Sequence, residues 1–129
     1  MGAKGGESIH HKKLRVFVLE NPDCVSVEGK IVISETEKSL PSGDRLDVFF
    51  ETRKRWYGIE VKSHISSESD IIPGLYQCVK YKVVMEKHLA VLGIDMDVKV
   101  ILALGHEFPR DLIPIKNTLG VNYVDTIEI

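Results

Sequence analysis

The sequence lacks several features that would assign it to a class at once. Its only two cysteines, Cys24 and Cys78, provide neither a disulfide framework nor the cysteine spacing of a metal site. No apolar run approaches the length of a membrane span, and the glycine-rich, charged N-terminus has no apolar signal core. Repeats, low-complexity tracts and linkers are lacking as well. These absences favour a cytoplasmic protein that does not bind a membrane.

An excess of positive charge is also lacking. The chain has 17 Lys and Arg residues against 19 Asp and Glu residues, a formal net charge of −2, whereas nucleic-acid-binding domains are usually basic. The positive charge is grouped, however, so a polyanion could still be held locally. The basic clusters are Lys12, Lys13 and Arg15; Arg53, Lys54 and Arg55; and Lys80, Lys82 and Lys87.

What is present suits one globular domain with a core of its own, because the 129 residues are 43% hydrophobic and 28% charged. We expect residues 1–6 to be flexible and residues 7–129 to form a single domain. Periodicity and turn signals predict the order α-β-β-β-α-β-α-β. The expected elements are a helix over 7–20 with Ser8 near its N-cap, strands over 30–35, 46–50 and 57–62, a helix from about 73 to 89, a strand over 98–104, a short helix over 109–119 closed by Gly120, and a strand over 121–124.

The most informative residues, Asp47 and Glu60-Val61-Lys62, lie on two of these strands, with residues 53–55 between them as a polar hairpin tip. Side chains at i and i+2 of a strand share a face, so Glu60 and Lys62 point the same way, and a hairpin can bring Asp47 beside them. Two carboxylates and an ammonium then converge. Oxygen ligands of this kind suit Mg²⁺, and the lysine can orient or polarise a water. The pattern predicts hydrolysis of a phosphodiester bond.

At these residues the sequence resembles the PD-(D/E)XK nuclease superfamily, which includes restriction enzymes, RecB-type nucleases and archaeal Holliday-junction resolvases. That family places an acid at the start of one strand and Glu-x-Lys or Asp-x-Lys on the next, as residues 43–47 and 59–62 do here. Leu46 stands where the family name has a proline, a position that is loosely kept. The resemblance covers roughly residues 7 to 104. It implies a restriction-endonuclease-like α/β core, with a mixed central sheet flanked by helices.

Two further motifs follow the order of that family. Gln77 and Tyr81 lie at i and i+4 on one helical face, which is similar to the Gln-x-x-x-Tyr of the RecB-like branch. Glu7, His11 and Leu14 form one stripe of the first helix, and in the family the glutamate of that helix often faces the active site. An acid at a helix start is also favoured by the helix dipole alone. We place His11 near the site, and its neighbour His10 in solvent.

The resemblance implies a metal-dependent nuclease that acts on nucleic acid, most readily DNA, in repair, recombination or restriction. Mg²⁺ or Mn²⁺ would bind Asp47, Glu60 and the backbone carbonyl of Val61, with Lys62 next to the attacking water. Glu7 would hold a second metal or a water bound to it. The expected substrate contacts are Gln77, Tyr81, Lys80, Arg53, Arg55, His11, and Lys12 or Lys13.

Each assignment has a structural alternative. Asp47, Glu60 and Lys62 could form a solvated strand face with a cross-strand ion pair. Asp44 could be the metal ligand in place of Asp47, although an acid after Ser-Gly is more often a turn former. Tyr81 could be a core residue with its hydroxyl at the rim of the core.

Two other functions also stay open. One is a Holliday-junction-resolvase-like endonuclease, which is similar in its small size and in a string like Glu60 to Ser63 but normally works as a basic dimer. The other is a non-catalytic nucleic-acid-binding or assembly module with a vestigial site. Because a domain of this size has little surface with which to read a target, a homodimer or a larger protein partner is open too.

Overall fold

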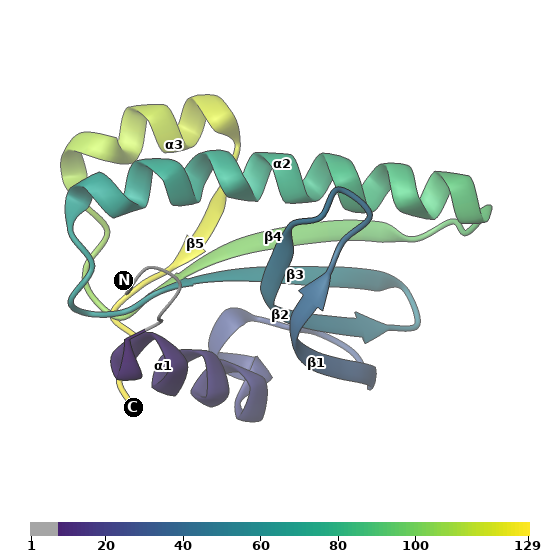
Figure 1. The fold of residues 1–129 in the computed structure, drawn as a ribbon, viewed down its shortest axis with the longest axis horizontal. Coiled ribbons are helices and arrows are strands. Elements are labelled where there is room, and N and C mark those ends of the chain that lie inside the picture. The colour runs from purple at the N-terminus through teal and green to yellow at the C-terminus, as the bar shows by residue number, and fades with distance from the viewer. Residues whose placement is uncertain (1–7) are drawn as a thin grey trace.

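The computed structural model describes residues 8–129, and the expectations for residues 1–6 and for Glu7 lie outside that part of the chain (Figure 1). No helix within 8–129 has the length and apolar character that crossing a membrane requires. The elements are the helices α1 (Ile9–Glu20), α2 (Glu68–Leu92) and α3 (Ile113–Leu119), the 3-10 turns η1 (Pro22–Val25) and η2 (Arg110–Leu112), and the strands β1 (Ile31–Ser39), β2 (Arg45–Thr52), β3 (Arg55–Lys62), β4 (Asp97–Leu104) and β5 (Asn122–Val124).

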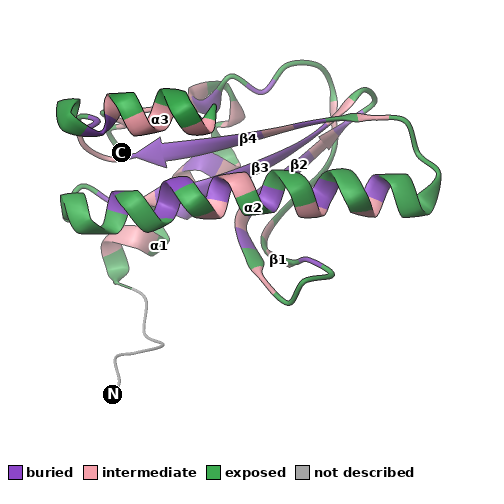
Figure 2. Ribbon diagram, turned by 90° about the horizontal axis from the view of Figure 1, so that it is seen from above, coloured by how far each residue is buried: buried purple, intermediate pink, exposed green. Residues whose placement is uncertain are grey.

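The five strands form one mixed sheet in the order β1-β2-β3-β4-β5. The first three are antiparallel neighbours, whereas β4 is parallel to both β3 and β5. Helix α2 makes the crossover between β3 and β4. It lies with α3 over one face of the sheet, and α1 lies over the other face (Figures 1 and 2). The predicted element order and the mixed α/β sheet flanked by helices are therefore confirmed.

Each face of the sheet carries its own hydrophobic core. Strand β3 divides its side chains between the two cores, because Trp56 packs toward α2 while Tyr57, Ile59 and Val61 pack toward α1. Strand β4 is buried on both faces, which explains its almost continuous apolar run. Burying one large aliphatic side chain stabilises a fold by about 1.5–3 kcal/mol. The two cores therefore fix β3, the strand on which the predicted site lies.

The start of α2 differs from the prediction. The helix begins at Glu68 rather than near Pro73, because Ser67 and Asp70 form a capping box in which Asp70 accepts the Ser67 N–H at 2.9 Å. Pro73 lies inside the helix, where it lacks the N–H that would bond the Ser69 carbonyl. At the other end, the helix continues past Leu89 to Leu92, and Gly93 closes it with φ of 71°.

Other boundaries differ by smaller amounts. Ser8 is the N-cap of α1, as predicted, and its hydroxyl accepts the His11 N–H at 3.0 Å. Strand β1 is longer than expected and runs to Ser39. Arg55 belongs to β3, so the hairpin tip is Arg53-Lys54. The expected helix over 109–119 is split into η2 and α3.

Candidate active site

The candidate site lies where β2 and β3 stop pairing. Their Cα register ends at Val48 opposite Ile59. One residue beyond, a side chain takes over from the backbone hydrogen bonds between the strands: Asp47 Oδ2 accepts the Val61 N–H at 2.8 Å. A buried strand N–H requires such a partner. This bond holds the Asp47 carboxylate against the tripeptide that contains Glu60 and Val61.

The structure brings the three residues of the predicted site together, and their side chains are largely buried. The side chains of Asp47, Glu60 and Lys62 are 17%, 12% and 23% exposed, and Lys62 Nζ lies 3.8 Å from Glu60 Oε2. The alternative of a solvated strand face therefore does not describe them. Their catalytic roles stay a prediction.

Glu60 has the most perturbed carboxyl group of the site. Burial, followed by the negative charge of Asp47, raises the pKa of Glu60 to about 8, while the Lys62 ammonium acts in the opposite direction. Two carboxylates that are held together out of water resist full ionisation. A bound cation would remove most of that resistance.

Helix α2 lies over the site with a face of small and aromatic residues. A Cβ added at Gly74 would lie 3.1 Å from Lys62 Cε and 3.3 Å from Leu102 Cδ1, so the missing side chain makes room for the lysine stem. One turn further along, Cys78 is buried, and burial together with the charge of Glu60 raises the pKa of its thiol. Sequence analysis missed both residues. An isolated glycine inside a helical pattern is a signal that could have pointed to Gly74.

Tyr81 continues the same face of α2 and is a core residue. It is 4% exposed, and its hydroxyl donates a hydrogen bond to the Arg45 carbonyl at 3.3 Å. Burial raises the pKa of the phenol. The hydroxyl therefore attaches α2 to the first residue of β2, two positions before Asp47. Gln77 is half-buried one turn earlier on α2.

Helix α1 contributes histidines from the other side. His11 Nε2 lies 3.5 Å from Asp47 Oδ1, which places His11 at the site as predicted. His10 is half-buried rather than solvent-exposed, and its ring meets the edge of the His64 ring with centroids 4.7 Å apart. The prediction for His10 was wrong because a contact from the loop after β3 cannot be read from helical periodicity.

Strand β1 adds a residue that sequence analysis did not single out. Glu37 lies between the pairs Thr36–Val48 and Lys38–Leu46, and hence opposite Asp47. Its φ is +52°, a conformation that costs a non-glycine residue about 1–3 kcal/mol. Two guanidinium groups bind its carboxylate, from Arg45 at 2.9 Å and from the buried Arg15 of α1 at 3.5 Å. These ion pairs tie α1 to both strands beside the site.

The remaining acid of the motif, Asp44, is a turn residue. Its carboxylate accepts a hydrogen bond from the Ser42 hydroxyl and lies 3.0 Å from Lys80 Nζ, and these contacts lower its pKa. Asp44 is therefore engaged in the β1–β2 turn, whereas Asp47 reaches the Glu60 strand. Lys80, an expected phosphate contact, is engaged with Asp44.

The structure does not bring the expected hairpin-tip contacts to the site. Arg55 and Lys62 are the first and last residues of β3, so the strand separates them by about 23 Å at roughly 3.3 Å per residue. Arg53 is exposed beyond that end. Lys12 and Lys13 are exposed on α1.

The acid pair suits a hard divalent cation. Within residues 8–129 no three His, Cys, Asp or Glu side chains are grouped as a preformed metal cage. Mg²⁺ seldom uses such a cage, because it keeps several waters and takes one or two carboxylates. Asp47 and Glu60 supply two carboxylates, and burial, followed by the charge of Asp47, raises the pKa of Glu60. The donor set therefore fits Mg²⁺ or Mn²⁺.

Comparison with known proteins gives a match at the level of fold. No protein-family model matches the sequence, and no curated protein matches it. The structure is similar to a chain in the solved structure of an EndoMS–dsDNA complex, with a TM-score of 0.61 and 15% sequence identity. The match covers 97% of this chain and 48% of that one, so this chain spans about half the length of its structural neighbour. At this identity, the likeness shows a shared fold.

Proposed function

We propose that this protein is a metal-dependent nuclease of the PD-(D/E)XK type that hydrolyses phosphodiester bonds in DNA. The observation that carries the proposal is the bond from Val61 N–H to Asp47, which holds that carboxylate beside Glu60 and Lys62. The DNA bound to the EndoMS chain of similar fold supports DNA as the polymer.

In this proposal, Asp47, Glu60 and the backbone carbonyl of Val61 hold Mg²⁺ or Mn²⁺. When bound, such an ion supplies a Lewis acid that makes water a better nucleophile and offsets charge growing on the phosphate. The chain itself keeps Asp47 oriented through the Val61 N–H and through His11, 3.5 Å away. Lys62 lies at the open edge of the pair and donates to the attacking water or to a phosphate oxygen.

Residues of α2 act in this proposal as positioning residues or substrate contacts. Tyr81 positions β2 through the Arg45 carbonyl. Gln77, half-buried on the same helix, contacts the DNA strand. Lys80 can do so only after leaving Asp44, with which it forms an ion pair at 3.0 Å. A cytoplasmic location, and a homodimer or a larger protein partner, stay predictions.

The proposal is tested by incubating the purified protein with supercoiled, linear, single-stranded and branched DNA, with Mg²⁺, Mn²⁺ or EDTA. We expect cleavage with either metal and none with EDTA. Preferential cutting of branched DNA would identify a junction-resolvase-like enzyme within the same proposal. Intact DNA under every condition, together with no metal binding, would identify a non-catalytic module and contradict the proposal.

A further inference from the structure

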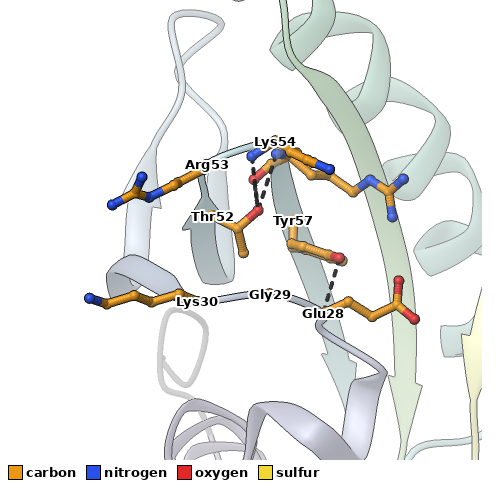
Figure 3. A pocket seen from close by; sticks show the side chains of 8 residues that line it. Glu28, Gly29, Lys30, Thr52, Arg53, Lys54 and Tyr57 are labelled. Carbon is orange, nitrogen blue, oxygen red and sulfur yellow. Dashed lines mark hydrogen bonds between the residues drawn. The ribbon is translucent and has the colours of Figure 1, made fainter.

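A cavity lies at the end of β3 that is remote from the acid pair (Figure 3). It has a volume of about 420 Å³ and is lined by residues 28–30 and 52–55 together with Tyr57. We call it the tip pocket. Four of its eight lining residues are basic: Lys30, Arg53, Lys54 and Arg55. A pocket of this charge suits an anion.

Hydrogen bonds hold the walls of the tip pocket in place. The Thr52 hydroxyl accepts the N–H groups of Lys54 at 3.3 Å and Arg55 at 3.1 Å, and it donates to the Arg55 carbonyl at 3.3 Å. The Tyr57 hydroxyl accepts the Glu28 N–H at 3.1 Å, which ties the segment before β1 to β3. The pocket is therefore preorganised, and an anion would not have to order the loop on binding.

The cationic charge in the tip pocket is only partly offset. Glu28 lines the pocket, and Asp97 lies 3.7 Å from the Arg55 guanidinium. Lys30 and Arg53 extend in the same direction, away from Tyr57 (Figure 3). In a chain with a net charge of −2, four basic lining residues against one lining carboxylate leave this end of β3 positively charged.

Strand β3 sets the distance between the two sites. It pairs with β4 without interruption from Arg55 opposite Asp97 to Lys62 opposite Leu104. Arg55 of the tip pocket and Glu60 of the acid pair are five residues apart on this strand, a rigid separation of about 17 Å at roughly 3.3 Å per residue. B-form DNA rises about 3.4 Å per base pair and bends little over such a length, so the same span takes about five base pairs. A flexible single strand gains much less from two fixed anchors.

We propose that the tip pocket holds a backbone phosphate of duplex DNA, about five base pairs from the phosphate at the Asp47–Glu60 pair. This inference rests on the proposed nuclease function and adds a substrate class, a duplex long enough to span both ends of β3.

The test measures binding of fluorescent blunt duplexes, graded from about 4 to 24 base pairs around the expected span, to full-length Lys62→Met protein in Mn²⁺, so that the acid pair keeps its metal while cleavage is blocked. We expect affinity to rise in a step once a duplex spans both sites, and no such step for single strands of equal length. The variant Arg53→Glu/Lys54→Glu should lose the step and flatten the salt dependence by about 0.9 in the log–log slope for each lost contact. Arg110→Glu/Lys116→Glu, on η2 and α3, is the charge-matched control and should keep the step.

The outcomes separate this inference from the proposed function. If affinity rises in a step with duplex length but no DNA is cleaved by the wild type, the phosphate contact at the tip pocket is supported and the proposed nuclease function is contradicted. If DNA is cleaved but Arg53→Glu/Lys54→Glu changes neither the length step nor the salt slope, the proposed phosphate contact at the tip pocket is wrong and the nuclease function is not affected. Inorganic phosphate serves as the small-anion probe. If it abolished duplex binding at micromolar concentration, the pocket would be a site for a free anion, and the inference would be wrong.

Discussion

At the scale of single residues, the site is defined by carboxylates that the fold keeps out of water. Glu60 is buried beside Asp47, and Lys62 compensates only in part, as the raised pKa of Glu60 shows. A catalytically idle strand would gain stability from an apolar residue in place of Glu60. A cation bound between the two carboxylates would offset their buried negative charge.

Glu60 should make the metal-free protein less stable as pH rises. Its pKa is about 8 in the folded state and near 4.5 when unfolded, so between these values the folded protein keeps a proton that the unfolded chain releases. The free energy of unfolding therefore falls across this window, by up to about 5 kcal/mol. Glu60→Gln cannot ionise. Denaturant unfolding in EDTA should show it more stable than wild type at pH 9, with the gap closing by pH 5.

Replacing Lys62 separates chemistry from packing. Lys62→Met keeps most of the apolar stem that lies against Gly74 but removes the ammonium. We expect a melting temperature within a few degrees of wild type, since stability should change by less than about 1 kcal/mol, and a loss of cleavage. Lys99→Met on β4, also half-buried, is the matched control. Cleavage by Lys62→Met at the wild-type rate would remove this residue from the mechanism.

At the scale of elements, regular strands were predictable and local exceptions were not. Strand β4 and the β2–β3 hairpin follow from apolar runs and turn residues, and the shared face of Glu60 and Lys62 follows from strand alternation. The start of α2 was missed because the proline was placed in the first turn, although Ser67 and Asp70 cap the helix five residues earlier. The role of Glu37 could not be read from the sequence, because nothing local marks a glutamate for positive φ.

The substitution Gly74→Ala in α2 should leave the stability of the fold almost unchanged but lower the cleavage rate. Alanine favours a helix over glycine by about 1 kcal/mol, which offsets the crowding of Leu102 by the new methyl group. The same methyl group would lie 3.1 Å from Lys62 Cε, so the flexible lysine end must move. Thermal unfolding should change little, while the cleavage rate falls. A Gly74→Ala protein that is fully active would show that the position of Lys62 is not set by α2.

At the scale of the whole molecule, the acid pair and the basic tip pocket lie toward opposite ends of one rigid strand. The carboxylates lie where β3 ends, and the tip pocket lies where it begins. The net charge of −2 gives no indication of this arrangement of the acid pair and the basic pocket. The sequence showed the basic clusters, but only the uninterrupted β3–β4 register places one of them at a fixed distance from the acids.

A shared metal should stabilise the entire fold by mass action. At 100 times its Kd, an ion that binds only the folded state adds about 2.7 kcal/mol. Mn²⁺ should therefore raise the melting temperature of the wild type and have little effect on Asp47→Asn or Glu60→Gln, with Asp111→Asn on η2 as a surface control. Equal shifts in all four proteins would place the metal elsewhere.

The central claim is that Asp47 and its neighbours form a metal-dependent nuclease centre. The most direct measurement is the Mn²⁺-dependent rate of DNA cleavage by wild type and Asp47→Asn. Because the asparagine side-chain oxygen can still accept the Val61 N–H bond, the variant should fold normally. We predict cleavage by the wild type that EDTA abolishes, and a rate lower by at least about 100-fold in Asp47→Asn, the loss expected when several kcal/mol of transition-state stabilisation are removed. Equal rates in the two proteins would contradict the account.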